Sequence, residues 1–595
     1  MLFQNDDVGN NLVPLNLKMA LQGGIVLSSR HEPFWPSRLP KTLSYPQVPL
    51  FRLLETAADF YPEKTAVNYY GLEISYSRLA SEVYSLAGAL AQAGIRKGDR
   101  VAVYMQNCPQ YIISFYGVMR ANAVVVPINP MNNEKELSFI LRDAEASALI
   151  TTTDLAPVVE AVRKEVGLKL IVAGRYQDYL PEHPALTVPE SLLIAPKCQL
   201  SCLDWETLIR KQIPAPDFAA KPADMCLLPY TSGSTGNPKG CIHTHCTVIS
   251  NLVSSYHWLT NTSSSVHLSV LPFFHVTGLI HSMLAPLYAG ASMVLLSRWD
   301  KYVALDAIEK YRVSHWVNIS TMLLDLLSIP DIANRDLRSL VLVGGGGAPL
   351  PEAVGKRLNE LTGVSYVEGY GLTETVSQTH FNPPDRPKMN CIGIPDFGVD
   401  ARIIDMDSRT ELGPGRPGEL VINGPEVFEG YWNRPEDTAE SFIEISGKRF
   451  LRTGDICSID EEGYFIIVDR TKRMINAAGF KVWPAEVENI LYDHPGVLEV
   501  CVVGVPDPVR LEEVRAYIVP KEQYRGSLSK QDIIAWSKER MAAYKYPRQV
   551  QFVDSLPKGS TGKILWRQIQ EEARTETSKG GNSHDILQNP SFKGC

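Results

Sequence analysis

The chain has 595 residues, of which 45% are apolar and 21% charged, as is usual for a globular protein of more than one domain. This composition excludes a wholly disordered chain, a collagen-like fibre and a small disulfide scaffold. The formal charge of −8 provides no global basic surface, so we do not expect nucleic acid as a partner. Ten scattered cysteines in so long a chain indicate reduced thiols and therefore a cytoplasmic location.

One long stretch carries no formal charge. Residues 241–297 contain no Asp, Glu, Lys or Arg, yet they hold six of the twelve histidines. Prolines, glycines and asparagines divide the stretch into pieces shorter than the roughly 20 apolar residues that a membrane span requires. We therefore expect a buried core, which could also line an apolar ligand pocket, and no transmembrane segment.

Apolar, strand-like runs alternate with amphipathic helical patterns between residues 48 and 400. The pattern predicts the helices 76–93, 111–119 and 134–143 and the strands 100–104, 123–126 and 148–150. Such alternation is typical of parallel sheets that carry helices on both faces. A further strand, 340–343, is expected to run into a loop at the four glycines 344–347, where backbone can approach a ligand.

The predicted pattern of secondary structure changes after residue 400. Shorter strands at 401–404, 418–422, 449–452 and 464–468 indicate a small β-rich subdomain. A second compact α+β unit follows, with helices 484–491 and 530–541 and strands 498–503, 514–519 and 549–553. The predicted fold class is therefore α/β: a large N-terminal domain of doubly wound sheets with the β-rich subdomain (1–469), a small α+β C-terminal domain (470–572) and a flexible tail (573–595).

The strongest local motif is the loop from Tyr230 to Gly240, which reads Tyr-Thr-Ser-Gly-Ser-Thr-Gly-Asn-Pro-Lys-Gly. Its glycines and hydroxyl residues allow several backbone amides to turn toward one anion, and Lys239 adds a positive charge. It is not a Walker A loop, because the residue after Lys239 is neither Ser nor Thr. Residues 559–563 (Gly-Ser-Thr-Gly-Lys) fail the same test and, taken alone, equally fit an ordinary turn.

This loop resembles the signature of the adenylate-forming superfamily, which comprises acyl-CoA synthetases, adenylation domains of nonribosomal peptide synthetases and beetle luciferases. Five further stretches are similar to family motifs and follow in family order: 370–375 (Tyr-Gly-Leu-Thr-Glu-Thr), 452–455 (Arg-Thr-Gly-Asp), 469–472 (Asp-Arg-Thr-Lys), 479–488 and 556–563. The matches span residues 51 to 567, and the chain looks most like a medium- or long-chain fatty-acid–CoA ligase.

The resemblance implies an AMP-forming acid–thiol ligase that uses ATP, Mg²⁺ and coenzyme A. A carboxylate attacks the α-phosphorus of ATP to give acyl-AMP and pyrophosphate, and a thiol then displaces AMP. The carboxylate is already ionised at neutral pH, so no general base is required. The difficulty is the approach of one anion to another, which positioning and fixed positive partners overcome.

The resemblance also implies a role for individual residues. The residues implied to bind the β- and γ-phosphates are Thr231, Ser232, Gly233, Ser234, Thr235, Gly236 and Lys239. Adenine is implied to stack on Tyr370, beside Gly346, Gly347 and Ala348. The ribose is implied to bind Asp455, with Arg470 nearby. Glu374 holds Mg²⁺, Thr373 contacts the α-phosphate and Lys563 bridges that phosphate and the carboxylate. For the second step, the mobile C-terminal domain swings about Lys472 and places the Ala477–Gly479 loop beside the thiol channel.

Each of these residues has a plainer interpretation. Asp455 and Arg470 could form a surface ion pair that contributes little, and Lys563 could be one solvated lysine among many. The run from Cys241 to Cys246 could be taken for a metal cluster, although it lacks the usual ligand spacing. The ordered set of motifs favours the functional interpretation for Lys563, Asp455 and Glu374.

The substrate is less well determined than the reaction. Amino-acid-activating relatives carry an Asp in the stretch that corresponds to 271–278, which has no acid here, although His275 is family-like at the entrance of the acyl pocket. Gly371 occupies the place of a pocket-blocking tryptophan in acetyl-specific relatives, and a deep apolar pocket favours medium or long chains. The alternatives are an aryl-acid CoA ligase, a luciferase-like oxygenase and a stand-alone enzyme that transfers its acyl group to a carrier protein. Oligomeric state, with a homodimer as one option, and peripheral membrane contact stay open.

Overall fold

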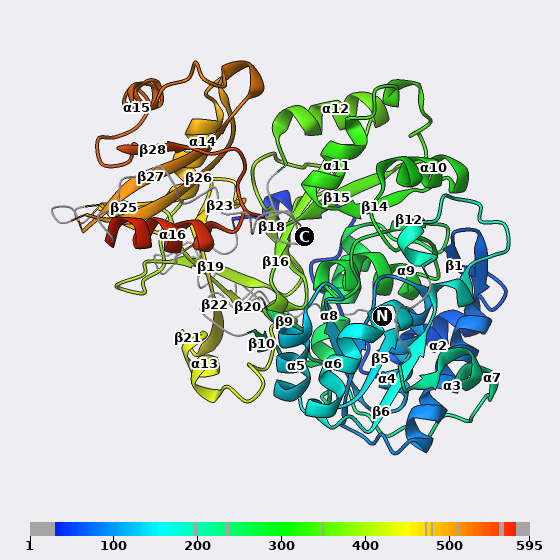
Figure 1. Cartoon of the computed structure of the whole chain (residues 1–595). Helices are drawn as coiled ribbons and strands as arrows, with labels where there is room; N and C mark the ends of the chain where they lie inside the picture. Colours follow the sequence, from blue (N-terminus) through cyan, green and yellow to red (C-terminus); the bar gives the residue numbers. More distant parts are fainter. Residues whose placement is uncertain are drawn as a thin grey trace, which may run out of the picture.

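The computed structural model describes residues 30–194, 200–231, 238–347, 350–470, 473–477, 480–507, 511–558 and 564–578. Two large sheets with their helices form the main body, a smaller antiparallel sheet adjoins it, and the α+β unit at the C-terminal end lies beside both (Figure 1). The α/β fold class that the sequence predicts is confirmed.

The first large sheet has nine strands in the order β18-β17-β16-β15-β14-β12-β13-β1-β2. Its central strands are parallel, whereas β2, β17 and β18 run antiparallel to their neighbours. The strands are β1 (Thr65–Tyr69), β2 (Leu72–Ser75), β12 (Val266–Ser269), β13 (Ser292–Leu295), β14 (His315–Asn318), β15 (Leu342–Gly346), β16 (Tyr366–Gly371), β17 (Gln378–Phe381) and β18 (Ile394–Pro395).

The second large sheet has seven strands in the order β11-β8-β4-β3-β5-β6-β7, all parallel except β11. A two-stranded ribbon, β9 with β10, accompanies it. The strands are β3 (Arg100–Tyr104), β4 (Val124–Ile128), β5 (Ala146–Thr152), β6 (Leu170–Gly174), β7 (Leu203–Asp204), β8 (Met225–Leu227), β9 (Tyr230–Thr231), β10 (Lys239–Gly240) and β11 (His243–Thr244).

The helices that cover the two sheets follow the apolar periodicity of the sequence. In α3 (Tyr76–Gln92), Leu79, Leu86 and Leu90 are fully buried on one face, and the Ser75 side chain caps the first turn. The other helices of this body are α2 (Phe51–Phe60), α4 (Pro109–Arg120), α5 (Glu134–Asp143), α6 (Ala156–Val166), α7 (Trp205–Arg210), α8 (His245–Trp258), α9 (Ala285–Tyr288), α10 (Lys301–Tyr311), α11 (Ser320–Leu327) and α12 (Glu352–Thr362). Short 3₁₀ turns lie at η2 (Glu32–Phe34), η3 (Thr153–Leu155), η4 (Tyr176–Tyr179), η5 (Glu190–Leu192), η7 (Ile332–Asn334), η8 (Thr373–Thr375) and, in the C-terminal unit, η10 (Glu522–Tyr524).

Most of the uncharged stretch 241–297 is core, as expected. It forms β11, α8, β12, the π-helix η6 (Gly278–Leu284), α9 and β13, and every residue of η6 is buried. Within the part of the chain that is described, no helix is both long and apolar enough to cross a membrane.

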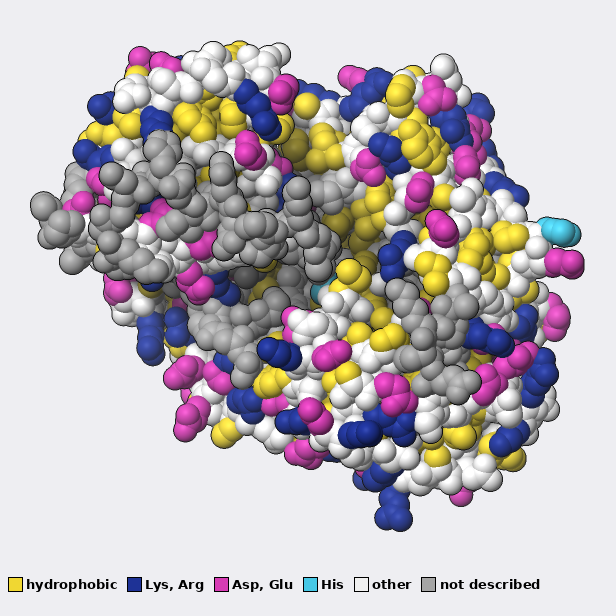
Figure 2. All heavy atoms as spheres, viewed as in Figure 1, with side chains coloured by type: hydrophobic (Ala, Val, Ile, Leu, Met, Phe, Trp, Pro, Cys, Tyr) yellow, Lys and Arg dark blue, Asp and Glu magenta, His cyan; other side chains and the backbone are white. Residues whose placement is uncertain are grey.

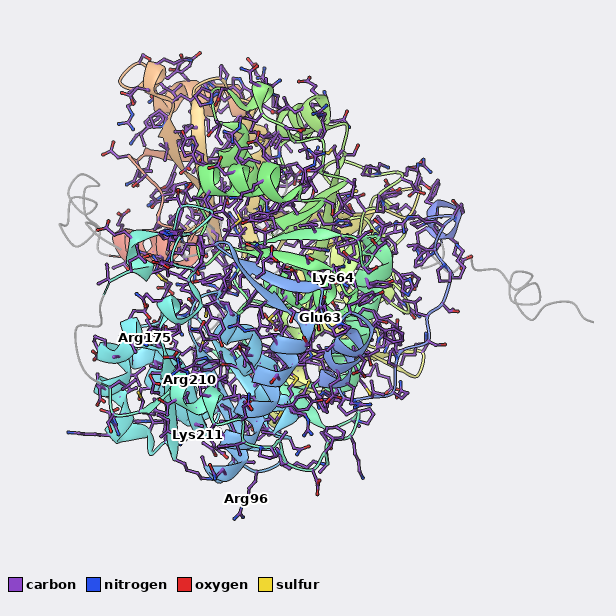
Figure 3. All side chains as sticks on the ribbon, turned by 90° about the vertical axis from the view of Figure 1, so that its right-hand side faces the viewer. Glu63, Lys64, Arg96, Arg175, Arg210 and Lys211 are labelled. Carbon is purple, nitrogen blue, oxygen red and sulfur yellow. The ribbon has the colours of Figure 1, made fainter. Side chains whose placement is uncertain are left out.

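Charged side chains lie on the outside. Arg96, Arg175, Arg210 and Lys211 are exposed on the half of the molecule that holds the seven-stranded sheet (Figure 3). Acidic and basic side chains are interspersed over the face shown in Figure 2, which agrees with the modest net charge.

The β-rich subdomain is an antiparallel sheet in the order β19-β20-β22-β21, with β23 paired to β22. Its elements are β19 (Asp400–Ile404), β20 (Gly418–Asn423), β21 (Phe442–Ile445), β22 (Lys448–Ile459), β23 (Phe465–Arg470) and α13 (Pro435–Glu440). β22 is much longer than the predicted strand 449–452, because it pairs with three neighbours along its length.

Sheet membership changes between Arg470, the last residue of β23, and Ile475, the first of β24. The C-terminal unit consists of β24 (Ile475–Ala477), β25 (Phe480–Val482), β26 (Val497–Asp507), β27 (Leu511–Pro520), β28 (Gln549–Phe552), α14 (Pro484–Tyr492), α15 (Lys530–Lys538) and α16 (Trp566–Ser578). α15 ends three residues before the predicted end at residue 541.

The expected tail boundary at residue 573 is wrong, because α16 continues to Ser578. Ala573 is fully buried against the C-terminal sheet, and Glu576 pairs with Arg515 at 3.2 Å. The polar composition of this stretch belongs to the exposed face of an amphipathic helix.

The glycine run at 344–347 also differs from the expectation of a loop. Gly344, Gly345 and Gly346 belong to strand β15, between β14 and β16. A Cβ atom on Gly345 would lie 1.9 Å from the Asn318 carbonyl oxygen, and one on Gly344 would lie 2.5 Å from that of Val367. Backbone approach is therefore the reason for these glycines, but the approaching backbone is that of the neighbouring strands.

This close approach predicts a stability effect. Gly345→Ala should destabilise the fold by about 2–3 kcal/mol or more, because the contacted oxygen belongs to the backbone of a central strand and cannot rotate away. Gly413→Ala is the matched control, because its Cβ would meet nothing within 4 Å, and its effect should stay within about 0.5 kcal/mol. Urea unfolding followed by tryptophan fluorescence measures both, and equal midpoints for the two variants would refute the packing argument.

Candidate active site

Two of the predicted motifs meet at the junction of the nine-stranded sheet and the β-rich subdomain. Tyr370, on β16, donates a hydrogen bond from its hydroxyl to Asp455 Oδ2 at 2.6 Å. Asp455 lies on β22 and is only 2% exposed, so it is not half of a surface ion pair. Its backbone neighbour across the β22–β23 ladder is Arg470. Three residues predicted from separate motifs therefore lie together.

A second contact joins the phosphate loop to the motif at 370–375. The Lys239 ammonium pairs with Asp437 and lies 5.2 Å from the centre of the Tyr431 ring. The Tyr431 hydroxyl donates to Glu374 Oε1 at 2.7 Å. Burial, together with the charge of Glu374, raises the pKa of Tyr431 far above its ordinary value, so the hydroxyl keeps its proton and acts as the donor.

Backbone pairing sets the position of Tyr431. The Ile242 amide donates to the Gly430 carbonyl at 2.9 Å, and the Trp432 amide donates to the Gly240 carbonyl at 2.8 Å. Residues 430–432 thus form a short ladder with the chain that leaves the phosphate loop. Sequence reasoning missed Tyr431, because a tyrosine among ordinary turn residues carries no signal of its own.

The two ends of the phosphate loop are held together. Thr231 and Lys239 pair across the antiparallel ribbon of β9 and β10. The loop residues between them, Ser232, Gly233, Ser234, Thr235 and Gly236, lie outside the described residues, as do Ala348, Lys472, Gly479 and Lys563. The predicted roles of these nine residues, like those of the other predicted site residues, remain predictions.

Gly346 lies beside the tyrosine that is expected to stack on adenine. It pairs with Gly369, the residue before Tyr370, and a Cβ on Gly346 would lie 2.3 Å from the Gly369 carbonyl oxygen. Gly347 follows with a φ of +86°, a conformation that favours glycine. The end of β15 therefore consists of bare backbone beside the part of β16 that carries Tyr370.

The stretch 271–278, which is expected to lie near the acid substrate, connects β12 to η6. His275 is exposed, in the connection between β12 and η6, and its ring lies 4.8 Å from that of Phe274. Asn107 fixes this connection, since its side chain donates to the Leu271 carbonyl and accepts from the Phe273 amide. The π-helix that follows is a rare element that occurs frequently at functional sites.

The local backbone requires a glycine at position 371, whatever acid the site binds. A Cβ there would lie 1.6 Å from the Ser377 carbonyl oxygen, so the local backbone excludes any side chain. This constraint is independent of the acid, and Gly371 is therefore a weaker indicator of pocket depth than the sequence suggests.

Glu374 suits the magnesium ion that the sequence motif implies. Mg²⁺ is usually held by one or two carboxylates together with phosphate oxygens and water, so a single well-placed carboxylate fits. Among the described residues, no group of three or more His, Cys, Asp or Glu side chains could hold a metal. In the run from Cys241 to Cys246, His243 contacts the Thr373 carbonyl and His245 accepts from the Leu50 amide.

Two family models match the chain: AMP-binding enzyme over residues 54–432, and AMP-binding enzyme C-terminal domain over residues 486–563. Among curated relatives, the chain is 35% identical to a long-chain-fatty-acid–CoA ligase of Bacillus subtilis, over 90% of this chain and 97% of that protein. It is also 35% identical to a feruloyl-CoA synthase of an Amycolatopsis species, over 86% and 96%.

Among solved structures, the anthranilate CoA ligase AuaEII in complex with anthranoyl-AMP matches with a TM-score of 0.77 and 28% identity, over 91% of this chain and 99% of that one. The first family model alone covers more than half of the chain. The chain therefore belongs to the adenylate-forming family of AMP-binding enzymes and is an acid–CoA ligase.

Proposed function

We propose that the chain activates a medium- or long-chain fatty acid with ATP to form acyl-AMP and then transfers the acyl group to coenzyme A. The convergence of motifs carries this proposal. Tyr370 meets Asp455, and Tyr431 joins Lys239 to Glu374, so residues proposed to contact adenine, ribose, phosphate and Mg²⁺ are brought together in two contacting groups.

In the first step the chain has to hold the fatty-acid carboxylate next to the α-phosphate of ATP, although both are anions. Tyr370 and Asp455 bind the nucleoside, with the Asp455 carboxylate accepting from ribose hydroxyls. Lys239 and the loop amides neutralise the outer phosphates, while Thr373 contacts the α-phosphate. Glu374 would hold Mg²⁺, which supplies positive charge to the departing pyrophosphate. Lys563 bridges the fatty-acid carboxylate and the α-phosphate in this proposal.

The second step requires a different arrangement of the same chain. We propose a boundary between residues 469 and 470, with Lys472 as the hinge. The change of sheet between Arg470 and Ile475 supports a pivot at this place. Rotation would remove Lys563 from the nucleotide and bring the Ala477–Gly479 loop to the thiol.

The fatty-acid assignment is supported by relatives and by the uncharged segment. Long-chain-fatty-acid–CoA ligases of B. subtilis and Escherichia coli are 35% and 33% identical to the chain. The 271–278 stretch offers no carboxylate for an amino-acid ammonium, and an unpaired buried cation would be costly. An aryl acid is the second candidate, since the feruloyl-CoA synthase is as similar as the B. subtilis ligase.

The location and the assembly state are also proposals. The eight described cysteines are all free thiols, which suits the cytoplasm. A homodimer and peripheral contact with a membrane remain options for the collection of a poorly soluble acid.

AMP release from ATP, measured over a panel of acids, tests the proposed function. Fatty acids should give acid-dependent AMP release only when coenzyme A is present to complete the cycle. The kcat/KM should rise with the length of the acid, because each buried methylene contributes about 0.8 kcal/mol. Preference for cinnamic-type acids would transfer the assignment to the aryl alternative. Acid-dependent pyrophosphate exchange with no turnover on coenzyme A would indicate a carrier-loading enzyme, and no acid-dependent reaction at all would end the ligase proposal.

Replacement of Lys563 separates the two half-reactions. Lys563→Ala should lower acyl-AMP formation by about 10²–10³-fold, because a fixed positive partner of the transition state is lost, and should leave thiolysis of supplied acyl-AMP largely unchanged. Lys558→Ala is the matched control, since Lys558 pairs with Glu499 at 2.5 Å on the surface of the same segment. Equal loss of both half-reactions in Lys563→Ala would contradict the alternating arrangement.

Tyr431 should influence the magnesium requirement. Tyr431→Phe keeps the ring beside Lys239 and removes the hydroxyl that orients Glu374, so the Mg²⁺ concentration for half-maximal activity should rise by about tenfold or more. Tyr104→Phe, which removes a hydroxyl bonded to the Asn132 carbonyl on the seven-stranded sheet, is the control. An unchanged magnesium curve for Tyr431→Phe would show that the hydroxyl does not orient the carboxylate.

A further inference from the structure

The turn that carries Thr373 and Glu374 is strained. Val376 has φ +63° and ψ −30°, a left-handed conformation that a β-branched side chain strongly disfavours. Such a residue costs about 1–3 kcal/mol and persists only where the surrounding structure fixes it. The strained residue lies two residues after Glu374, in the same turn as the two residues to which the proposed reaction assigns the α-phosphate and Mg²⁺.

The far end of the turn is fixed by helix α8. The Asn251 side chain donates to the carbonyls of Thr375 and Gln378, at 3.1 and 2.8 Å. The Gln378 side-chain Nε2 donates back to the Asn251 backbone carbonyl at 2.9 Å. Within the turn, Thr375 Oγ1 accepts from the Leu372 amide at 3.0 Å. These bonds hold Leu372 and the residues after Glu374. The Thr373 carbonyl accepts from the Val376 amide at 3.1 Å within the turn, so a donor from outside the turn is needed to fix its position relative to the rest of the site.

His243 holds the near end. Its Nε2 lies 2.8 Å from the Thr373 carbonyl oxygen, and its Nδ1 lies 3.3 Å from Thr247 Oγ1. The side chain is completely buried, and burial lowers its pKa to about 4 against the opposing effect of the Thr373 carbonyl, so the ring is neutral near pH 7. A carbonyl oxygen only accepts, so Nε2 carries the ring proton and donates it.

The place of His243 in the chain gives the contact its significance. His243 is the first residue of β11, three residues after Gly240, and residues 240–242 pair with 430–432. The same short segment thus fixes the phosphate loop, Tyr431 and, through His243, the Thr373 peptide. Glu374 is held on its other side, because its carbonyl accepts from the Phe428 amide at 2.8 Å.

We propose that His243 is a positioning residue for acid activation: its Nε2–H donor holds the Thr373 peptide at a fixed distance from the phosphate loop, so that Thr373 and Glu374 face the α-phosphate and Mg²⁺ together. This inference rests on the proposed function. His243 touches neither substrate nor metal and acts through the backbone of the strained turn. Without the donor, the turn can relax toward ordinary dihedral angles and move both side chains.

The test compares replacements that keep or remove the donor. His243→Gln retains an amide nitrogen at the position of Nε2, whereas His243→Met fills a similar volume without a donor. We expect His243→Met to lower kcat for acid-dependent ATP–pyrophosphate exchange by about 10–100-fold, with the KM for the acid little changed, and His243→Gln to recover most of the loss. His267→Met is the control for the removal of a buried histidine, since His267 stacks on His315 in the nine-stranded sheet.

Thermal unfolding of each purified full-length variant is measured alongside exchange. A folded His243→Met with wild-type kcat would overturn the proposal, and so would equal losses in His243→Gln and His243→Met. If His243→Met does not fold, His243→Asn replaces it, because its amide is one methylene too short to reach the Thr373 carbonyl. Failure of the wild-type chain to catalyse exchange with any acid would instead overturn the proposed function.

Discussion

The short backbone ladder between residues 240–242 and 430–432 is the constraint on which the site depends. It joins the chain that leaves the phosphate loop to a segment almost two hundred residues later. Because the ladder places Tyr431 between Lys239 and Glu374, one local pairing sets the spacing between the proposed phosphate contact and the proposed magnesium ligand. The Tyr370–Asp455 hydrogen bond makes the corresponding link between the two residues proposed to bind the nucleoside.

The site lies where the three sheets meet, and this explains why its residues are far apart in sequence. β16 of the nine-stranded sheet supplies Tyr370, the ribbon beside the seven-stranded sheet supplies Lys239, and β22 of the small sheet supplies Asp455. Figure 2 shows the surface hollowed between the C-terminal unit and the region around α12, with hydrophobic side chains in the hollow. A ligand that reaches the junction can therefore contact several elements at once.

Strongly patterned elements could be predicted from the sequence, and elements defined by their neighbours could not. α5 has the predicted bounds because its apolar periodicity coincides with the Asn133–Glu136 capping box. The glycines of β15 were expected in a loop, because the close approach of Asn318 exists only after the sheet has formed. Asp455 and Glu374 are site candidates that ordered motifs predict, whereas Tyr431 and His243 make contacts that no sequence spacing reveals. Lys563 and most of the phosphate loop stay predictions.

The central claim is that one nucleotide site is assembled from Tyr370, Asp455 and the Thr373–Glu374 turn. A crystal structure with an acyl-sulfamoyl-adenosine analogue of the adenylate tests it most directly. The account predicts adenine against the Tyr370 ring, both ribose hydroxyls on the Asp455 carboxylate and the sulfamoyl group beside Thr373. An analogue bound with its ribose away from Asp455, or on another face of the molecule, would contradict the account.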